Sequence, residues 1–158
     1  MSETVLRLSD VTKTYPGVRA LDKMNLDCIE GEVHAVLGEN GSGKSPLLKT
    51  ASGSVTPDSG TIEIAGKILD RADPRLAHSL GLATVYQDGS LVEELTVAQN
   101  LFLGTPPGEV KFSEVTKWAT DKLAPFDLGI DATRTVEELT PAHRQFAEIG
   151  KVLLSNPR

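Results

Sequence analysis

The sequence GENGSGKS at residues 38–45 follows an apolar run, Val33 to Leu37, and precedes a short helical pattern. Its glycines let the backbone turn and bring N–H groups close to phosphate oxygens. A helix that begins here adds partial positive charge at its N-terminus. Lys44 is suited to reach the β- and γ-phosphates, and the Ser45 hydroxyl to ligate Mg²⁺. The stretch predicts that the chain binds a nucleoside triphosphate through Gly38, Glu39, Asn40, Gly41, Ser42, Gly43, Lys44 and Ser45.

Two alternatives exist for this stretch, an ordinary glycine-rich turn between a strand and a helix, and a hairpin turn at Asn40-Gly41 or Ser42-Gly43. The surrounding sequence favours the phosphate-binding interpretation. Leu47 to Ser52 has the composition of a short helix, and Gly53 follows as its stop. The continuously apolar Val33 to Leu37 predicts a buried central strand that leads into the loop.

Composition limits the classes of protein. The chain has 158 residues, within the size of one domain. It carries 16 Lys and Arg against 22 Asp and Glu, a formal charge of −6, which argues against nucleic acid as a partner. The single cysteine, Cys28, excludes an internal disulfide and fits a reducing cytosol. We expect Cys28 to be packed rather than to act as a nucleophile.

No basic-then-apolar leader begins the chain, and no apolar run approaches the roughly 20 residues that span a bilayer. We therefore expect any link to a membrane to come through a partner. His34, His78 and His143 lack companions at metal-ligand spacing, so we expect no histidine metal site.

The first part of the chain predicts strands and short helices. Alternating polarity over Val5 to Leu8 and Leu21 to Ile29, with a turn at Tyr15-Pro16-Gly17 between them, predicts antiparallel strands. A hairpin is predicted around Gly66. Asp73-Pro74 is typical of the start of a helix, and Leu82 to Tyr86 predicts a second buried strand.

From Thr96 onward the pattern is helical. Thr96 and Gln99 have capping-box spacing, a second helix begins at Ser113, and a third begins with Thr140 as cap and Pro141 as its first residue. In the third helix one apolar face is predicted, and the large aromatic residues are expected in the core. The face consists of Ala142, Phe146, Ile149 and Leu153, and the aromatic residues are Phe102, Trp118, Phe126 and Phe146.

Several separated segments resemble the nucleotide-binding subunits of ATP-binding-cassette (ABC) transporters, most closely those of bacterial monosaccharide importers. The strings are YPGVRALD from Tyr15, GEVHAVLGENGSGKS from Gly31, LLKTASGSVTPDSGTI from Leu47, VYQDGSLVEELTVAQNLFLG from Val85 and RQFAEIGKVLLSNPR from Arg144. The last two strings point to the sugar-importer branch. The resemblance covers essentially the whole chain.

The resemblance implies roles for single residues. Tyr15 is similar to the family's adenine-stacking aromatic, although it is also explained as a turn residue packing on Pro16. Gln87 stands where the family has the glutamine whose oxygen approaches Mg²⁺ and the attacking water, and whose loop contacts the membrane subunit. Lys44 and Gln87 are thus the implied catalytic residues, and Ser45 and Gln87 the implied metal ligands.

Two stretches depart from the family pattern. Leu139, Thr140, Pro141, Ala142 and His143 resemble the signature that faces the partner subunit's ATP, but the usual serine, two glycines and glutamine are absent. Pro46 stands where the family has threonine near the α-phosphate. Because proline has no N–H, both departures remove donors, and each is expected to weaken ATP binding. Proline is tolerated in a first helical turn, so the helix should survive.

The family's Asp-Glu strand and histidine loop, expected after Asn156-Pro157-Arg158, are not in this sequence. The resemblance therefore implies that this chain alone lacks the group that positions water for hydrolysis. It also implies an incomplete core sheet with exposed apolar edges. We expect a fragment of a longer subunit, or folding by swapping, dimerising or rearranging.

The fold expected is an α/β P-loop NTPase of the ABC ATPase type. Residues 1–90 form an antiparallel β subdomain with a partial parallel core sheet, and residues 91–158 a helical subdomain. The implied function is the ATP-binding part of an importer, for sugar, on the inner face of the cell membrane. The implied partners are ATP, Mg²⁺, permease subunits, a second nucleotide-binding domain and, indirectly, an external solute-binding protein. The alternatives are a non-hydrolysing nucleotide-binding module and a soluble ABC ATPase unconnected with transport.

Overall fold

The computed structural model describes residues 3–85, 90–103, 105, 108–154 and 157. The chain forms two compact units, Met1–Ala83 and Thr84–Pro157, and each has its own hydrophobic core. The division near residue 90 that the sequence suggests stays a prediction.

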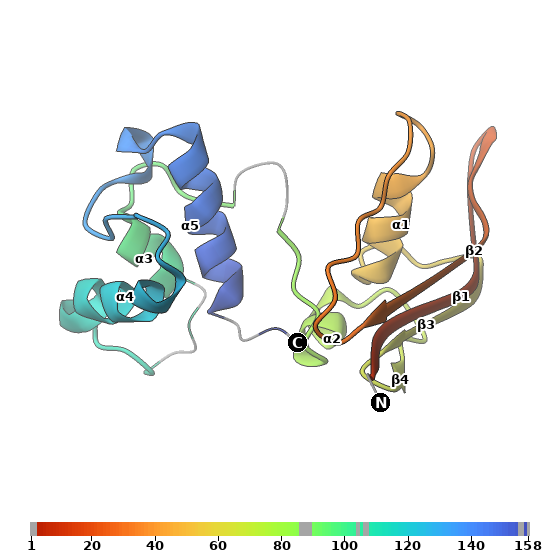
Figure 1. Cartoon of the computed structure of the whole chain (residues 1–158), viewed down its shortest axis with the longest axis horizontal. Helices are drawn as coiled ribbons and strands as arrows, with labels where there is room; N and C mark the ends of the chain where they lie inside the picture. Colours follow the sequence, from red (N-terminus) through yellow and green to blue (C-terminus); the bar gives the residue numbers. More distant parts are fainter. Residues whose placement is uncertain (1–2, 86–89, 104, 106–107, 155–156, 158) are drawn as a thin grey trace. The chain divides into compact units, whose positions relative to one another are not determined.

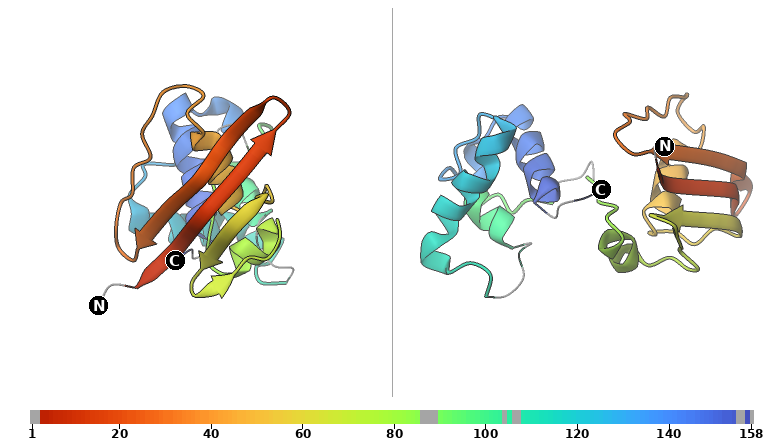
Figure 2. Two further views of the ribbon diagram at one scale, coloured as in Figure 1. Left: turned by 90° about the vertical axis from the view of Figure 1, so that its right-hand side faces the viewer. Right: turned by 60° about the horizontal axis from the view of Figure 1, so that its bottom comes forward.

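Unit 1 contains a four-stranded antiparallel sheet with the order β2-β1-β3-β4. Strands β1 (Thr4–Tyr15) and β2 (Val18–Ile29) form a long hairpin whose last pair is Tyr15 with Val18. Strands β3 (Ser59–Ile64) and β4 (Lys67–Ile68) form the short hairpin around Gly66. Both hairpins that the sequence predicts are confirmed, and Figure 2 shows the strands lying side by side.

Helix α1 (Lys44–Ala51) packs on one face of this sheet, as Figure 1 shows. Helix α2 (Pro74–Ser79) begins as predicted, because the Asp73 carboxylate accepts the N–H of Leu76 at 3.0 Å. The core that sheet and helices enclose consists of Leu8, Val11, Leu21, Leu47, Ala51, Ile62, Ile64, Leu69 and Ala77. Burial of these apolar side chains fixes the start of α1 against the sheet.

Two strands that the sequence predicts are absent from the described residues. Val33 to Leu37 and residues 82–85 have no regular secondary structure and pair with no strand, and Val33 and Leu37 are 97% and 90% exposed. An extended segment becomes a strand only where a neighbour pairs with its N–H and C=O groups. Each strand of the described sheet pairs elsewhere, so the expected parallel core strands are not formed here. Only Val36 of the first segment packs against the core.

Unit 2 is helical. Its helices are α3 (Val97–Phe102), α4 (Val115–Leu123) and α5 (Pro141–Leu153), with 3₁₀ turns η1 (Phe112–Glu114), η2 (Ala124–Phe126) and η3 (Val136–Glu138). The predicted capping box is present, because Thr96 Oγ1 accepts the N–H of Gln99 while Gln99 Oε1 accepts the N–H of Thr96. The core contains Val97, Ala98, Leu101, Val115, Ala119, Leu123, Ala132, Val136, Leu139 and Ala147.

The apolar face predicted for α5 is wrong for two of its four residues. Ala142 and Phe146 are exposed, Ile149 and Leu153 are half-buried, and the residues that α5 buries fully are Ala147 and Gly150. A Cβ at Gly150 would lie 2.8 Å from Leu123 Cδ2, so the helix approaches α4 through its small residues. Phe126 is also exposed rather than in the core, whereas Phe102 and Trp118 do pack against it.

Candidate functional site

The phosphate loop, Gly38–Ser45, ends in a tight left-handed turn that starts α1. Gly43 is the N-cap of α1 with φ of 91°, and its carbonyl accepts the N–H of Leu47 at 2.9 Å. A Cβ on Gly43 would lie 2.5 Å from the Ala20 carbonyl oxygen of β2, and one on Gly38 would lie 2.5 Å from Ser42 Oγ. The loop is thus held against the sheet at a place that only glycine fits.

The N–H groups of the loop are largely free. Ser42 donates to the Glu39 carbonyl at 3.2 Å. The backbone N–H groups of Gly41, Gly43, Lys44 and Ser45 have no acceptor among the residues that the structure describes. Free donors at the start of a helix, together with the helix dipole, favour an anion. The loop therefore has the chemistry of a phosphate site.

The ammonium group of Lys44 lies within the loop. Lys44 Nζ donates to the Gly38 and Glu39 carbonyls, both at 2.6 Å, and lies 3.4 Å from Ser42 Oγ. These carbonyls are neutral acceptors, which bind an ammonium more weakly than an anion does. A bound phosphate is thus able to replace these carbonyls as the hydrogen-bond partner of the Lys44 ammonium.

Pro46 is the third residue of α1 and does not disturb the helix. Its carbonyl accepts the hydroxyl of Thr50 at 2.8 Å, and Thr50 is fully buried. An N–H at this position has no intrahelical acceptor in any case. The expectation that α1 forms in spite of Pro46 is confirmed.

Tyr15 is the last residue of β1, at the hairpin turn, and 36% of it is exposed. The hairpin turn and the phosphate loop lie toward the same end of unit 1 (Figure 1). Strand β2 connects them, since Val18 pairs with Tyr15 and Ala20 touches Gly43. Tyr15, Gly38–Ser45 and Pro46 are therefore brought together in one unit.

The signature-like residues start α5 in unit 2. Thr140 is the N-cap and accepts the N–H of His143 at 3.3 Å, Pro141 is the first helical residue, and Ala142 is exposed. Leu139 is buried in the core of this unit. The ring of His143 lies 6.5 Å from that of Phe146. The Thr140 hydroxyl thus serves its own helix in this structure.

Comparison with known proteins gives the family. The model of the family "ABC transporter" matches residues 21–158. The chain belongs to the ABC transporter family. An arabinose import ATP-binding protein of Burkholderia ambifaria is 43% identical over 98% of this chain and 30% of its own length. A ribose import ATP-binding protein of Streptomyces avermitilis is 39% identical over 99% of this chain and 31% of its own length. The chain thus spans less than a third of these relatives.

Solved structures agree on the fold. A nucleotide-free ATP-binding cassette of an ABC transporter has a TM-score of 0.85 at 27% identity, covering 98% of this chain and 66% of that one. A dimeric cassette in a post-hydrolysis state, bound to ADP and Pi, has a TM-score of 0.78 at 26% identity, covering 96% and 70%. The expected P-loop fold of the ABC ATPase type is confirmed.

Gln87 and Cys28 are two further residues of this ABC family chain that the sequence singles out. Gln87 lies outside the described residues. Burial raises the pKa of the Cys28 thiol, and the Glu32 and Asp27 carboxylates raise it further. Since the thiolate is the nucleophile, a raised pKa argues against a nucleophilic Cys28. Within the described ranges no three His, Cys, Asp or Glu side chains form a metal cluster, and no helix is long and apolar enough to cross a membrane.

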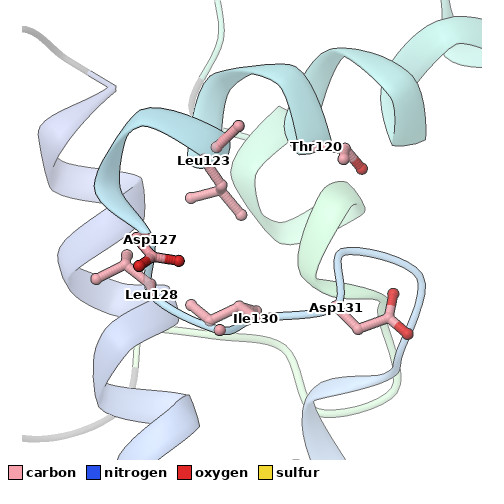
Figure 3. A pocket seen from close by; sticks show the side chains of 8 residues that line it. Thr120, Leu123, Asp127, Leu128, Ile130 and Asp131 are labelled. Atoms are coloured by element: carbon pink, nitrogen blue, oxygen red, sulfur yellow. The ribbon is translucent and has the colours of Figure 1, made fainter.

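A hollow of about 350 Å³ lies in unit 2, at the end of α4. The apolar side chains of Leu123, Leu128 and Ile130 line it together with the carboxylates of Asp127 and Asp131 (Figure 3). The Thr133 side chain and N–H hold the pKa of the Asp131 carboxyl below its usual range. Of the predicted site residues that the structure describes, none lines this hollow.

Sequence reasoning missed two residues beside Tyr15. Lys13 Nζ lies 5.8 Å from the centroid of the Tyr15 ring, and it donates to Asp58 Oδ1 at 2.8 Å. Lys13 stands two residues before Tyr15, but Asp58 lies 45 positions after Lys13 in a turn sequence. A pattern within one segment gives no signal for such a pair.

Proposed function

We propose that the chain captures ATP in the loop Gly38–Ser45 and forms the nucleotide-binding part of an importer. The observation that carries this proposal is the loop geometry. Gly43 packs on β2 in a left-handed turn, and the N–H groups around it are free for an anion. The Lys44 ammonium, next to the same loop, adds a full positive charge.

We propose the following residue roles on this basis. We assign the triphosphate to the loop residues Gly38, Glu39, Asn40, Gly41, Ser42, Gly43, Lys44 and Ser45, chiefly through those N–H groups that have no acceptor within the loop. Lys44 then pairs with the terminal phosphates and the exposed Ser45 hydroxyl contributes to holding Mg²⁺, with Gln87 as a further ligand. Magnesium bound with the nucleotide neutralises phosphate charge. Tyr15 offers a half-exposed ring to the base.

For the whole protein we propose ATP hydrolysis coupled to uptake of a sugar through membrane permease subunits at the inner face of the membrane. The support is the function for which the relatives are named, import of arabinose or ribose. We further propose a second nucleotide-binding domain as partner, facing Leu139–His143, because a related cassette is described as dimeric. An external solute-binding protein completes this proposal. The alternatives of a non-hydrolysing module or a soluble ATPase find no support in the importer relatives.

Calorimetric titration with Mg·ATP tests the proposed capture of ATP. We expect saturable binding by the unaltered chain and a loss of about ten-fold or more in Lys44→Met, since a charge-assisted hydrogen bond contributes roughly 1.5–3 kcal/mol. Lys49→Met, in the last turn of the same helix, is the matched control and should bind normally. An unaltered chain that does not bind, or a Lys44→Met variant that binds equally well, contradicts the proposal.

Pro46→Thr should tighten ATP binding by about ten-fold, because it restores one N–H and one hydroxyl near the phosphates, and one such bond corresponds to about 1.4 kcal/mol. The helix itself should be unchanged, since the Pro46 carbonyl and not its nitrogen makes the bond to Thr50. Pro74→Thr makes the same exchange in the first turn of α2, away from the loop, and should leave affinity unchanged. Equal affinities of Pro46→Thr and the unaltered chain, measured by calorimetry, refute this expectation.

A further inference from the structure

The Tyr15 ring has a cation on one side. Lys13 Nζ lies 5.8 Å from the ring centroid, within the roughly 6 Å over which a cation interacts with an aromatic face. The Lys13 side chain is only 18% exposed, whereas Tyr15 keeps 36% of its surface in solvent. The Lys13 ammonium thus lies over the ring, while about a third of the surface of Tyr15 remains in solvent.

Asp58 holds Lys13 in this position. Lys13 Nζ donates to Asp58 Oδ1 and to the Thr56 carbonyl, both at 2.8 Å. The second oxygen, Asp58 Oδ2, accepts the N–H of Thr14 at 2.7 Å, and the Asp58 N–H donates to the Thr12 carbonyl at 2.8 Å. The turn before β3 is therefore bound to three successive residues of β1, directly before Tyr15.

Lys13, Asp58 and Tyr15 form a cluster in which the charges of Lys13 and Asp58 stabilise each other. The hydrogen bond from Lys13 and the N–H of Thr14 lower the pKa of the Asp58 carboxyl. Because the Asp58 carboxyl is exposed, its ion pair with Lys13 contributes little to the stability of the fold. Its effect is to hold the Lys13 ammonium in one position. A lysine with two acceptors has few alternative positions, so the ammonium stays beside the ring.

We propose that Lys13 and Asp58 are positioning residues for base recognition. They hold the Tyr15 ring with the ammonium at one side, so that the ring presents its open side to the base of the nucleotide. This inference rests on the proposed capture of ATP. It adds that affinity for the base depends on a lysine and an aspartate that touch neither base nor phosphate.

The geometry gives a selective effect. The cluster acts on the ring and leaves the phosphate loop alone, since Lys44 and the free N–H groups lie on α1 and its preceding turn. Weakening the cluster should therefore reduce binding of ATP but not of a phosphate chain without a base. The change expected for a cation at a partly exposed ring is about two- to five-fold.

The test compares ATP with inorganic tripolyphosphate, both with Mg²⁺, by calorimetry. Lys13→Met keeps the length of the side chain without its charge, and Asp58→Asn keeps an acceptor for Thr14 but releases Lys13. Both should lose about two- to five-fold in ATP affinity and keep their affinity for tripolyphosphate. Lys13→Arg, which keeps charge and pairing, should restore ATP binding, and Lys67→Met on β4 is the surface control.

These outcomes distinguish the proposed role of Lys13 and Asp58 from the proposed capture of ATP on which it rests. Equal losses for ATP and tripolyphosphate in Lys13→Met and Asp58→Asn indicate a merely structural role and overturn it. Unchanged ATP affinity in both variants overturns it as well, while the proposed capture of ATP stands. An unaltered chain that binds neither ligand overturns the proposed function, and this inference with it.

Discussion

Replacing Gly43 by alanine is expected to abolish saturable ATP binding and to lower the thermal unfolding midpoint of unit 1. Gly43 has φ of 91°, and an alanine Cβ would lie 2.5 Å from the Ala20 carbonyl oxygen. A left-handed backbone costs an L-residue roughly 1–2 kcal/mol, and overpacking typically adds about 1–3 kcal/mol. Backbone on both sides of the contact has to shift, and the N–H groups of the loop shift with it.

The control for Gly43→Ala is Gly66→Ala. Gly66 also has positive φ, 76°, but a Cβ there would meet nothing within 4 Å. Gly66→Ala therefore carries the cost of the backbone conformation without the collision, and ATP binding should stay intact. Thermal unfolding and calorimetric titration of both variants give the comparison. Normal ATP affinity in Gly43→Ala would mean that contact with β2 does not shape the loop.

The parts of the fold that the sequence predicts correctly depend on local chemistry. Asp73, Thr96 and Thr140 cap helices at the residues expected, because a cap joins groups only two or three positions apart. The hairpin turns at Pro16-Gly17 and around Gly66 form for the same reason. Short-range hydrogen bonds and positive φ angles can be predicted from residues that are neighbours in the sequence.

The errors concern partners that are distant in sequence. Val33 to Leu37 has the apolar pattern of a buried strand, but no described strand pairs with it. A hydrophobic pattern indicates which secondary structure a segment is suited to form, but it does not identify the strand that would pair with the segment. In α5 the spacing of the apolar residues predicts a face that includes Ala142 and Phe146, whereas Gly150 and Ala147 allow the close approach to the rest of unit 2. Apolar spacing alone does not identify the face that packs.

The candidate site shows the same distinction. The loop Gly38–Ser45 is one contiguous stretch, so spacing indicates it directly. The collision that requires glycine at position 43 involves Ala20, and the cluster at Tyr15 involves Asp58. Both depend on how β1, β2 and the turn before β3 come together, which no single segment contains.

In unit 2, Asn100→Ala is expected to lower the free energy of unfolding by about 2–4 kcal/mol. Asn100 is fully buried in α3, where its Nδ2 donates to the Val92 and Thr96 carbonyls at 2.9 and 3.1 Å. Its Oδ1 accepts the N–H of Val92 at 2.7 Å. Alanine removes these hydrogen bonds together with the buried amide; the Val92 carbonyl keeps the N–H of Leu95 at 3.3 Å, whereas the Val92 N–H loses its acceptor. Each lost bond contributes roughly 0.5–1.5 kcal/mol.

Trp118, the chain's single tryptophan, packs against the core of unit 2 and reports its unfolding by fluorescence in denaturant. Thr133→Ala is the control, since it removes the exposed hydroxyl that bonds Asp131 at 2.6 Å, where water replaces the lost partner. We expect that variant to change the free energy of unfolding by less than about 1 kcal/mol. A loss in Asn100→Ala no larger than in Thr133→Ala would show that the segment around Val92 finds other hydrogen bonds. The larger loss would instead show that one buried amide fixes this segment to α3.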